Sequence, residues 1–212
     1  MQKDIGLIIG ELSKQAKDQA VVSRATPFQV LIATVLSQRT KDINTGKAAK
    51  ALFLQFKTPK ALSKAPVHEI EKLIKAAGFF RVKAKRIKEI SQIIDEKYNG
   101  KLPCDRTQLD ALPGVGPKTS ACTMVYGFKK PAICVDAHVH RISNRIGLVN
   151  TKTPEETEAE LTKVVPKKYW LKLNHAMVRF GQKICLPRNP LHEECALKKQ
   201  CDFFKGRGRW KK

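Results

Sequence analysis

One stretch, residues 112–136, constrains the fold and chemistry of this chain more than any other. It reads LPGVGPKTSACTMVYGFKKPAICVD. Gly114 and Gly116 permit a left-handed turn and the close approach of another backbone. Pro117 suits the first position of a helix, where a missing amide hydrogen costs nothing. The stretch therefore predicts a tight turn that leads directly into a helix.

Two residues with chemical capacity frame the helix that follows the turn. Lys118 falls in its first turn, where backbone amides can hold a phosphate. The positive end of the helix dipole disfavours an ammonium and favours the neutral amine, which is a nucleophile. Asp136 ends the apolar run with a carboxylate. Taken singly, these residues also fit a surface lysine and an aspartate that caps a helix, and the residues alone leave both interpretations open.

The order of these motifs resembles a known family. LPGVGPKT, followed by VDAHVHR, resembles the helix-hairpin-helix signature of the endonuclease III family of DNA base-excision glycosylases. The resemblance implies that Lys118 is the nucleophile and that Asp136 is the catalytic aspartate. It also implies that Gly114, Val115 and Gly116 contact DNA.

Helical periodicity runs through the chain, and no two-residue alternation typical of strands is sustained. Thr26-Pro27 and Thr153-Pro154 predict helix starts, each with a capping residue followed by proline. Further helices are expected at 1–19, at about 43–56, at 81–98 and near 106–111. A helix that begins near Val67 is expected to end at Gly78, the helix at 81–98 at Asn99-Gly100, and the helix after Asp136 at Gly147. Periodicity predicts helices but no arrangement. The family resemblance implies an all-α fold of two domains: a six-helix domain at 20–130, and a second domain made of 1–19 and 131–212.

The charge of the chain predicts its partner. Lys and Arg number 41 against 19 Asp and Glu, a net charge of +22, which favours nucleic acid. No apolar run approaches the roughly 20 residues that a membrane span needs, and no signal peptide is recognisable. We therefore expect an intracellular protein, in the cytoplasm or nucleoid of a prokaryote. The resemblance implies a monomer that binds double-stranded DNA with a damaged base or an abasic site.

Further segments match the family at its DNA contacts. LSQRTKD, residues 36–42, resembles the segment that enters DNA from the minor groove, with Arg39 where the family often has glutamine. Phe79 matches an apolar wedge, which would fill the space left by an extruded nucleotide. Its alternative is an ordinary core aromatic. His138 and Arg141, on the helix after Asp136, are expected to contact DNA or to support the carboxylate.

The helix predicted at 81–98 carries several basic residues. Its apolar residues are expected to face inward. Its outward face is expected to hold four cations: Lys83, Lys85, Arg86 and Lys88.

The C-terminal cysteines have the spacing of a metal site. The family holds a 4Fe-4S cluster in a C-x6-C-x2-C-x5-C loop, and this chain has histidine at the second position: Cys185, His192, Cys195 and Cys201. We expect a 4Fe-4S cluster, since histidine ligates cluster iron in Rieske centres. Zinc is the alternative, since three cysteines and one histidine form a common zinc site, and a metal-free loop is a third possibility. The remaining cysteines are expected to be buried and apolar: Cys104, Cys122 and Cys134.

The resemblance implies a bifunctional enzyme that removes oxidised or ring-saturated pyrimidines and cleaves the abasic site by β-elimination through a lysine Schiff base. Two alternatives remain open. One is a mismatch-specific thymine or uracil glycosylase of the same superfamily, against which Lys118 argues because relatives without lyase activity lack that lysine. The other is a non-catalytic helix-hairpin-helix protein, against which Asp136 and the cysteine loop argue.

Overall fold

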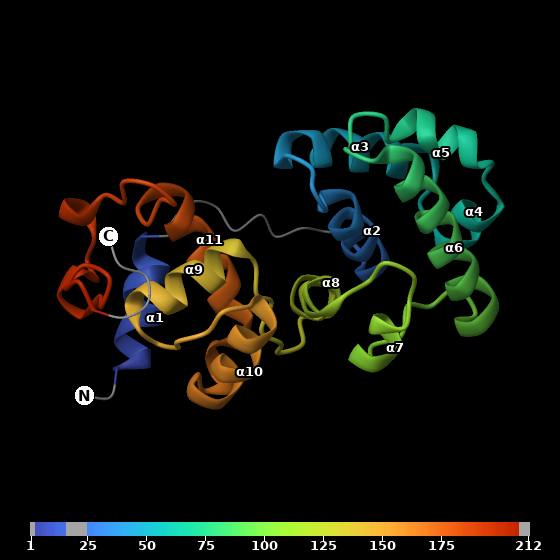
Figure 1. Ribbon diagram of the computed structural model, residues 1–212. Coiled ribbons are helices and arrows are strands. Elements are labelled where there is room, and N and C mark those ends of the chain that lie inside the picture. The colour runs from blue at the N-terminus through green and yellow to red at the C-terminus, as the bar shows by residue number, and fades with distance from the viewer. Residues whose placement is uncertain (1–2, 16–24, 208–212) are drawn as a thin grey trace. The chain divides into compact units, whose positions relative to one another are not determined.

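The computed structural model describes residues 3–15 and 25–207, and this part of the chain is helical (Figure 1). The contacts divide the chain into two compact units. The hairpin unit is Ser23–Lys130, and the terminal unit combines Met1–Val22 with Pro131–Lys212. The boundaries expected from the sequence were 19/20 and 130/131.

The hairpin unit contains seven α-helices and one π-helical turn within its described residues. They are α2 (Pro27–Ser37), α3 (Asp42–Gln55), α4 (Pro59–Lys64), α5 (Val67–Leu73), α6 (Phe80–Tyr98), α7 (Arg106–Asp110), α8 (Pro117–Cys122) and η1 (Thr123–Gly127). The six predicted helices did not include α4. Its start repeats the Thr-Pro signal of α2, because the Thr58 hydroxyl accepts a hydrogen bond from the amide of Ala61.

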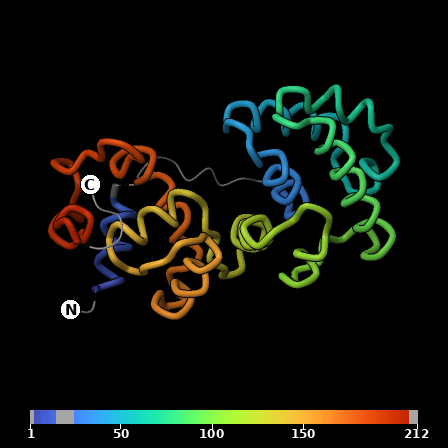
Figure 2. Tube along the Cα trace, in the orientation of Figure 1, coloured from blue at the N-terminus to red at the C-terminus, as the bar shows by residue number. Residues whose placement is uncertain are grey.

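Helix α2 is the centre of the hairpin unit, and it contacts α3, α6, α8 and η1 (Figure 2). The predicted Thr26 cap is confirmed and forms a full capping box with Gln29. A helix packed on several sides must be apolar around most of its circumference, and α2 buries Phe28, Leu31, Ile32, Val35 and Leu36.

Helix α6 is the longest helix of this unit and packs against α4 and α5. It ends at Asn99, in the left-handed conformation with φ 51°, as the Asn-Gly signal predicted. The helix before it is shorter than predicted. It ends at Leu73 rather than at Gly78, because Gly78 belongs to the corner that starts α6.

The terminal unit is built on helix α11. Its elements are α1 (Ile5–Gln15), α9 (Ala137–Ile146), α10 (Pro154–Val164), η2 (Lys167–Tyr169), α11 (Trp170–Lys183), η3 (His192–Glu194) and η4 (Lys198–Gln200). Helix α11 contacts α1 and α9, and α10 packs on α9. The buried core includes Ile8, Leu12, Val139, Ile142 and Phe180. Residues 1–2 and 16–19 of the predicted N-terminal helix lie outside the described residues.

Two predicted signals in the terminal unit are confirmed. Thr153 and Glu156 form a capping box at the start of α10, and Gly147 ends α9 with φ 84°. Within the described ranges, no helix has both the length and the apolar character to cross a bilayer.

Candidate functional site

The glycine turn before α8 is held by the helix beside it. Gly114 has φ +70°, and a Cβ atom there would lie 2.2 Å from Cδ and Nε of Arg86. Gly116 differs, since its backbone is extended, with φ −108° and ψ −178°, and a Cβ would meet nothing within 4 Å. The left-handed turn expected from the glycines therefore forms at Gly114 alone, and Gly116 leaves open space at the start of α8.

Lys118 is the second residue of α8, after Pro117 at the first position, and its side chain is exposed. The next two residues, Thr119 and Ser120, are buried and anchor the helix. Val115 is also buried, and its amide donates to the carbonyl of Leu112 within the turn. The side chain of Val115 therefore fixes the hairpin from inside, and the residue offers only backbone atoms to a ligand.

A side chain that the sequence did not single out ties the turn to the end of α2. Nε2 of Gln38 donates to the carbonyl of Gly114 at 3.0 Å and to Oγ1 of Thr119 at 3.3 Å. The loop that carries Arg39 is thereby connected to the hairpin that carries Lys118. In the sequence, the role of Gln38 was indicated only by its place directly before Arg39.

Arg39 and Phe79, from segments far apart in the sequence, meet on the surface of the hairpin unit. The Arg39 guanidinium lies 5.8 Å from the centre of the Phe79 ring, within the range of a cation–π contact. Both residues have left-handed backbones, with φ 51° and 57°. Phe79 is 62% exposed, so its alternative as a core aromatic is wrong. The Arg39–Phe79 pair and its neighbours border a hollow of about 200 Å³.

Lys83 lies beneath this pair and is 3% exposed, so the prediction that it faces outward is wrong. Its Nζ donates to the carbonyls of Leu36 and Gln38 and to Oγ1 of Thr40, at 2.6–2.8 Å. Burial lowers the pKa of this ammonium, and the charge of Arg86 lowers it further. Helical periodicity did not predict the burial of Lys83, because the carbonyls that it binds belong to the end of another helix, α2.

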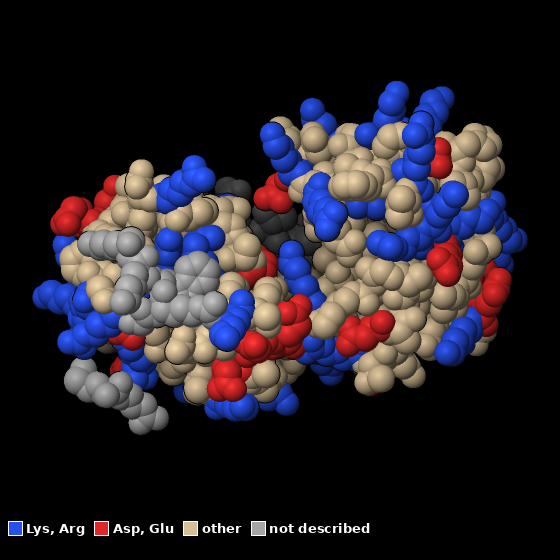
Figure 3. Space-filling model, viewed as in Figure 1, with Lys and Arg blue, Asp and Glu red and all other residues tan. Residues whose placement is uncertain are grey.

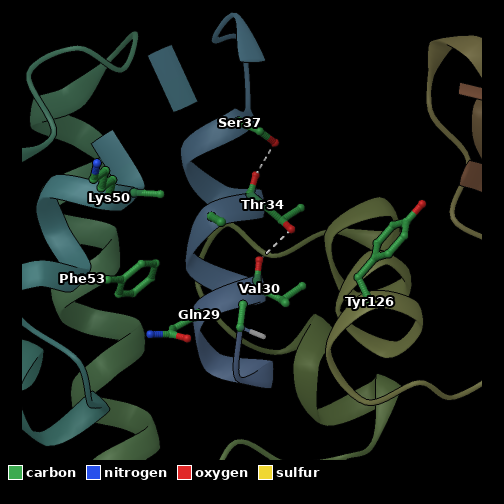
Figure 4. A pocket seen from close by; sticks show the side chains of 10 residues that line it. Gln29, Val30, Thr34, Ser37, Lys50, Phe53 and Tyr126 are labelled. Carbon is green, nitrogen blue, oxygen red and sulfur yellow. Dashed lines mark hydrogen bonds between the residues drawn. The ribbon is translucent and has the colours of Figure 1, made fainter. Parts of the chain in front are cut away.

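A second hollow, of about 590 Å³, opens along α2 between α3 and η1 (Figure 4). Phe53 and Tyr126 flank α2 on opposite sides. The hydroxyls of Thr34 and Ser37 donate to carbonyls of their own helix, at 2.8 Å each. Their oxygen lone pairs remain as acceptors, in a pocket of the size that small molecules occupy. No motif predicted this pocket.

Asp136 caps α9 in the terminal unit. Its Oδ1 accepts hydrogen bonds from the amides of His138 and Val139, both at 2.9 Å. The interpretation of Asp136 as a helix cap is thus confirmed for one oxygen. Across the part of the chain that the structure describes, no hydrogen bond reaches Oδ2. The cap therefore orients the carboxylate without using its second oxygen.

Two roles were predicted for Arg141, a contact with DNA or support of the Asp136 carboxylate, and its position fits the second. It is buried, and its guanidinium donates to the carbonyls of Gly181 and Cys185, which joins α9 to the end of α11. Burial lowers the pKa of Arg141. Its Nη2 also lies 3.1 Å from Nδ1 of His138. Since a guanidinium only donates, Nδ1 accepts, and the proton of a neutral His138 is on Nε2.

The four predicted metal ligands line one small pocket in the terminal unit. Its free volume is about 20 Å³, which is room for about one water molecule. Burial raises the pKa of the Cys195 and Cys201 thiols, and neighbouring cysteines raise both further. The donor set suits iron or zinc. Yet no three His, Cys, Asp or Glu side chains are arranged to hold a metal ion among residues 3–15 and 25–207.

Arg145 packs against this cysteine loop. Its guanidinium lies 4.5 Å from the Phe203 ring centre, donates to the carbonyls of Leu186 and Pro187, and lies 3.5 Å from Sγ of Cys185. The pocket therefore has a fixed cationic wall. Of the other cysteines, Cys122 and Cys134 are buried as expected, but each is disulfide-bonded rather than a free thiol. Cys104 is exposed because it lies in the loop before α7.

The surface of the hairpin unit is basic. In the view of Figure 3, Lys and Arg side chains greatly outnumber Asp and Glu over this unit. Such a surface attracts polyanions over distances of about 8–10 Å in physiological salt.

The sequence matches a family described as "HhH-GPD superfamily base excision DNA repair protein" over residues 32–167. It is 55% identical over 183 residues to Endonuclease III of Thermotoga maritima, which covers 86% of each chain.

Two solved structures are similar over nearly the whole chain. One is a trapped endonuclease III–DNA covalent intermediate, with a TM-score of 0.85 and 34% identity, covering 96% of this chain and 98% of the other. The other is a thermostable thymine-DNA glycosylase, with a TM-score of 0.82 and 28% identity, covering 95% and 96%.

The two glycines of the turn should respond differently to alanine. We expect Gly114→Ala to cost at least about 1–2 kcal/mol of unfolding free energy, because alanine disfavours positive φ and its Cβ displaces Arg86. Gly116→Ala should change stability by less than about 0.5 kcal/mol. Denaturant unfolding measures both, and equal losses would contradict the distinct roles of these glycines.

Proposed function

Since the chain belongs to the HhH-GPD superfamily of base excision DNA repair proteins, we propose that Lys118 and Asp136 carry out its chemistry on oxidised or ring-saturated pyrimidines. The protein is a DNA glycosylase and abasic-site lyase. The observation that carries the proposal is the exposed Lys118 at the start of a helix, directly after a glycine turn whose shape neighbouring side chains enforce.

DNA binding uses the basic hairpin unit. The open space beside Gly116 allows a phosphate to approach the backbone at the start of α8. The Arg39–Phe79 pair enters the duplex where a nucleotide has been extruded, with the ring filling the gap and the guanidinium adding a cation. Phosphate contacts set the register, and lesions that pair or stack poorly cost less to extrude. The partner is therefore duplex DNA with a damaged base or an abasic site.

Lys118 is the nucleophile. Its neutral amine attacks C1′ of the extruded deoxyribose, the bond from C1′ to the base breaks, and the base leaves with the electron pair and takes up a proton. The sugar ring opens to give a Schiff base between C1′ and Nζ. This imine acidifies C2′. Loss of a C2′ proton expels the 3′ phosphate and cleaves the strand by β-elimination.

Asp136 supports the step in which the base leaves. Positive charge develops on the sugar as the bond to the base weakens, and a fixed carboxylate stabilises that charge. The cap on α9 holds Oδ1, so Oδ2 is the oxygen assigned to this task and to proton transfer. Arg141, bonded to α11, keeps the helix behind this carboxylate in place.

The mismatch alternative is supported by the similarity to a thymine-DNA glycosylase. It is less well supported than the bifunctional proposal, because identity to endonuclease III is higher and Lys118 is present. A non-catalytic DNA-binding role would need neither the exposed amine of Lys118 nor the second carboxylate oxygen of Asp136, which the helix cap does not use.

The cysteine loop is proposed to hold a 4Fe-4S cluster through Cys185, His192, Cys195 and Cys201. Support comes from the ligand spacing and from the lining of one pocket by all four side chains. The cluster would fix the loop after α11, and Arg145 would supply a cation beside Cys185. Zinc remains the alternative.

Lys118→Gln should abolish the covalent adduct that borohydride traps on abasic DNA, because the amide cannot form a Schiff base. Lys101→Gln is the matched control, since Lys101 is also exposed and loses the same charge. Denaturing gel electrophoresis reports the adduct. If the wild-type protein forms none, or if Lys118→Gln still forms one, the bifunctional assignment to Lys118 is wrong.

Asp136→Asn should lower the rate of base removal by about 10²-fold or more while DNA affinity stays unchanged, because asparagine keeps the helix cap and loses the charge. Asp136→Ala should lose the cap as well, at about 0.5–2 kcal/mol of stability. Single-turnover kinetics and thermal unfolding separate the two effects. A loss of affinity equal to the loss of rate would make Asp136 a structural residue only.

The purified protein should contain about four iron atoms and four sulfides per chain and absorb visible light. His192→Cys should keep the cluster and lower its reduction potential, because thiolate stabilises the oxidised iron more than imidazole does. Glu193→Gln, next to His192 but outside the proposed ligand set, is the control. A colourless protein with stoichiometric zinc would overturn the cluster in favour of a zinc site.

A further inference from the structure

We propose that Lys83 is a positioning residue that sets the Arg39–Phe79 pair in its DNA-entering conformation before DNA binds. This inference rests on the proposed function. It adds a buried residue, which contacts neither the base nor the sugar, to the parts of the molecule that decide whether a nucleotide is extruded.

The ammonium of Lys83 is fully used inside the protein. It has three hydrogens, and three oxygens accept them: the carbonyls of Leu36 and Gln38 and the hydroxyl of Thr40. Two of these acceptors belong to Gln38 and Thr40, the residues on either side of Arg39. Lys83 therefore binds the backbone carbonyl of the residue before Arg39 and the side-chain hydroxyl of the residue after it, on either side of the position with φ 51°.

The same contacts reach the second half of the pair. Oγ1 of Thr40, which accepts from Lys83, also accepts from the amide of Gly78 at 3.1 Å. A Cβ at Gly78 would lie 2.9 Å from the carbonyl oxygen of Arg39, so the two backbones touch. Phe79 follows directly, with φ 57°. One buried cation thus fixes the loop of Arg39 and, through Thr40, the corner of Phe79.

The left-handed conformations require such a support. Residues with side chains rarely adopt positive φ, and they keep it only where the surrounding structure enforces it. Arg39 and Phe79 both project into solvent, so packing of their own side chains does not enforce it. The hydrogen bonds to Lys83 and Thr40 supply this support, together with the turn bond from the amide of Thr40 to the carbonyl of Ser37 at 3.1 Å.

When the Arg39–Phe79 pair is already held in place, its entry into DNA costs less free energy, because the two loops need not be ordered during binding. The chemistry at Lys118 has no such requirement when the nucleotide is already unstacked. Loss of Lys83 should therefore slow the reaction in duplex DNA and spare it on a single strand.

The test compares Lys83→Met with Lys85→Met, which removes the same charge from an exposed position of the same helix. We expect Lys83→Met to lower kcat/KM on a duplex with an oxidised pyrimidine by about tenfold relative to Lys85→Met. Borohydride trapping on a single-stranded abasic oligonucleotide should change by less than about twofold. Equal behaviour of the variants on the duplex, or an equal loss on the single strand, would overturn the proposal.

A double-mutant cycle tests whether Lys83 acts through Arg39. In an Arg39→Ala background, Lys83→Met should lower duplex activity by less than about twofold, because the group it positions is gone. A full tenfold loss in that background would refute the mechanism.

Thr40→Val provides a second route if Lys83→Met does not fold, as judged by circular dichroism and thermal unfolding. Valine keeps the shape of threonine and removes the shared acceptor, so the same loss confined to the duplex is expected. Thr40→Val activity equal to wild type would overturn the proposal. If the wild type forms no borohydride adduct, the proposed function itself fails. A trapped wild type with indistinguishable Lys83 and Lys85 variants defeats this inference alone.

Discussion

The last carbonyls of a helix need hydrogen-bond donors, and at the end of α2 a buried lysine supplies them. Carbonyls left without partners away from water cost about 1–3 kcal/mol each, so Lys83 is retained inside although burial opposes its charge. Since α2 is also the helix on which most of its unit packs, its end is a fixed point. The loop of Arg39, the corner of Phe79 and, through Gln38, the hairpin are built on that point.

The hairpin shows how a motif depends on residues outside it. Gly114 is required because its backbone turns left-handed and because Arg86 of α6 lies against it. Gln38 binds the same glycine from another side. The position of Lys118 is therefore set by α2 and α6 as much as by the motif that contains it, which gives the candidate nucleophile a rigid base and an exposed side chain.

The terminal unit uses buried guanidinium groups for the same purpose. Arg141 and Arg145, one helical turn apart on α9, bond to the carbonyls at the end of α11 and in the loop that follows. Arginine suits this task because its donors are arrayed in a plane and its charge persists when buried. Asp136, at the start of α9, is thereby connected through one helix to the loop with the cysteines.

The sequence by itself determined the helices, their capped starts, the glycine turn, the lysine and aspartate, and the spacing of the cysteines, because these follow from local backbone preferences and short-range order. It placed Lys83 outside, extended the helix before Gly78 and did not reveal the hydrogen bonds of Gln38, because the partners of these residues lie some 40 to 80 residues away in the chain. The meeting of Arg39 with Phe79 likewise required the folded unit. Periodicity reports which face of a helix is apolar, whereas only tertiary structure decides which distant carbonyl needs a donor, and so which lysine is buried.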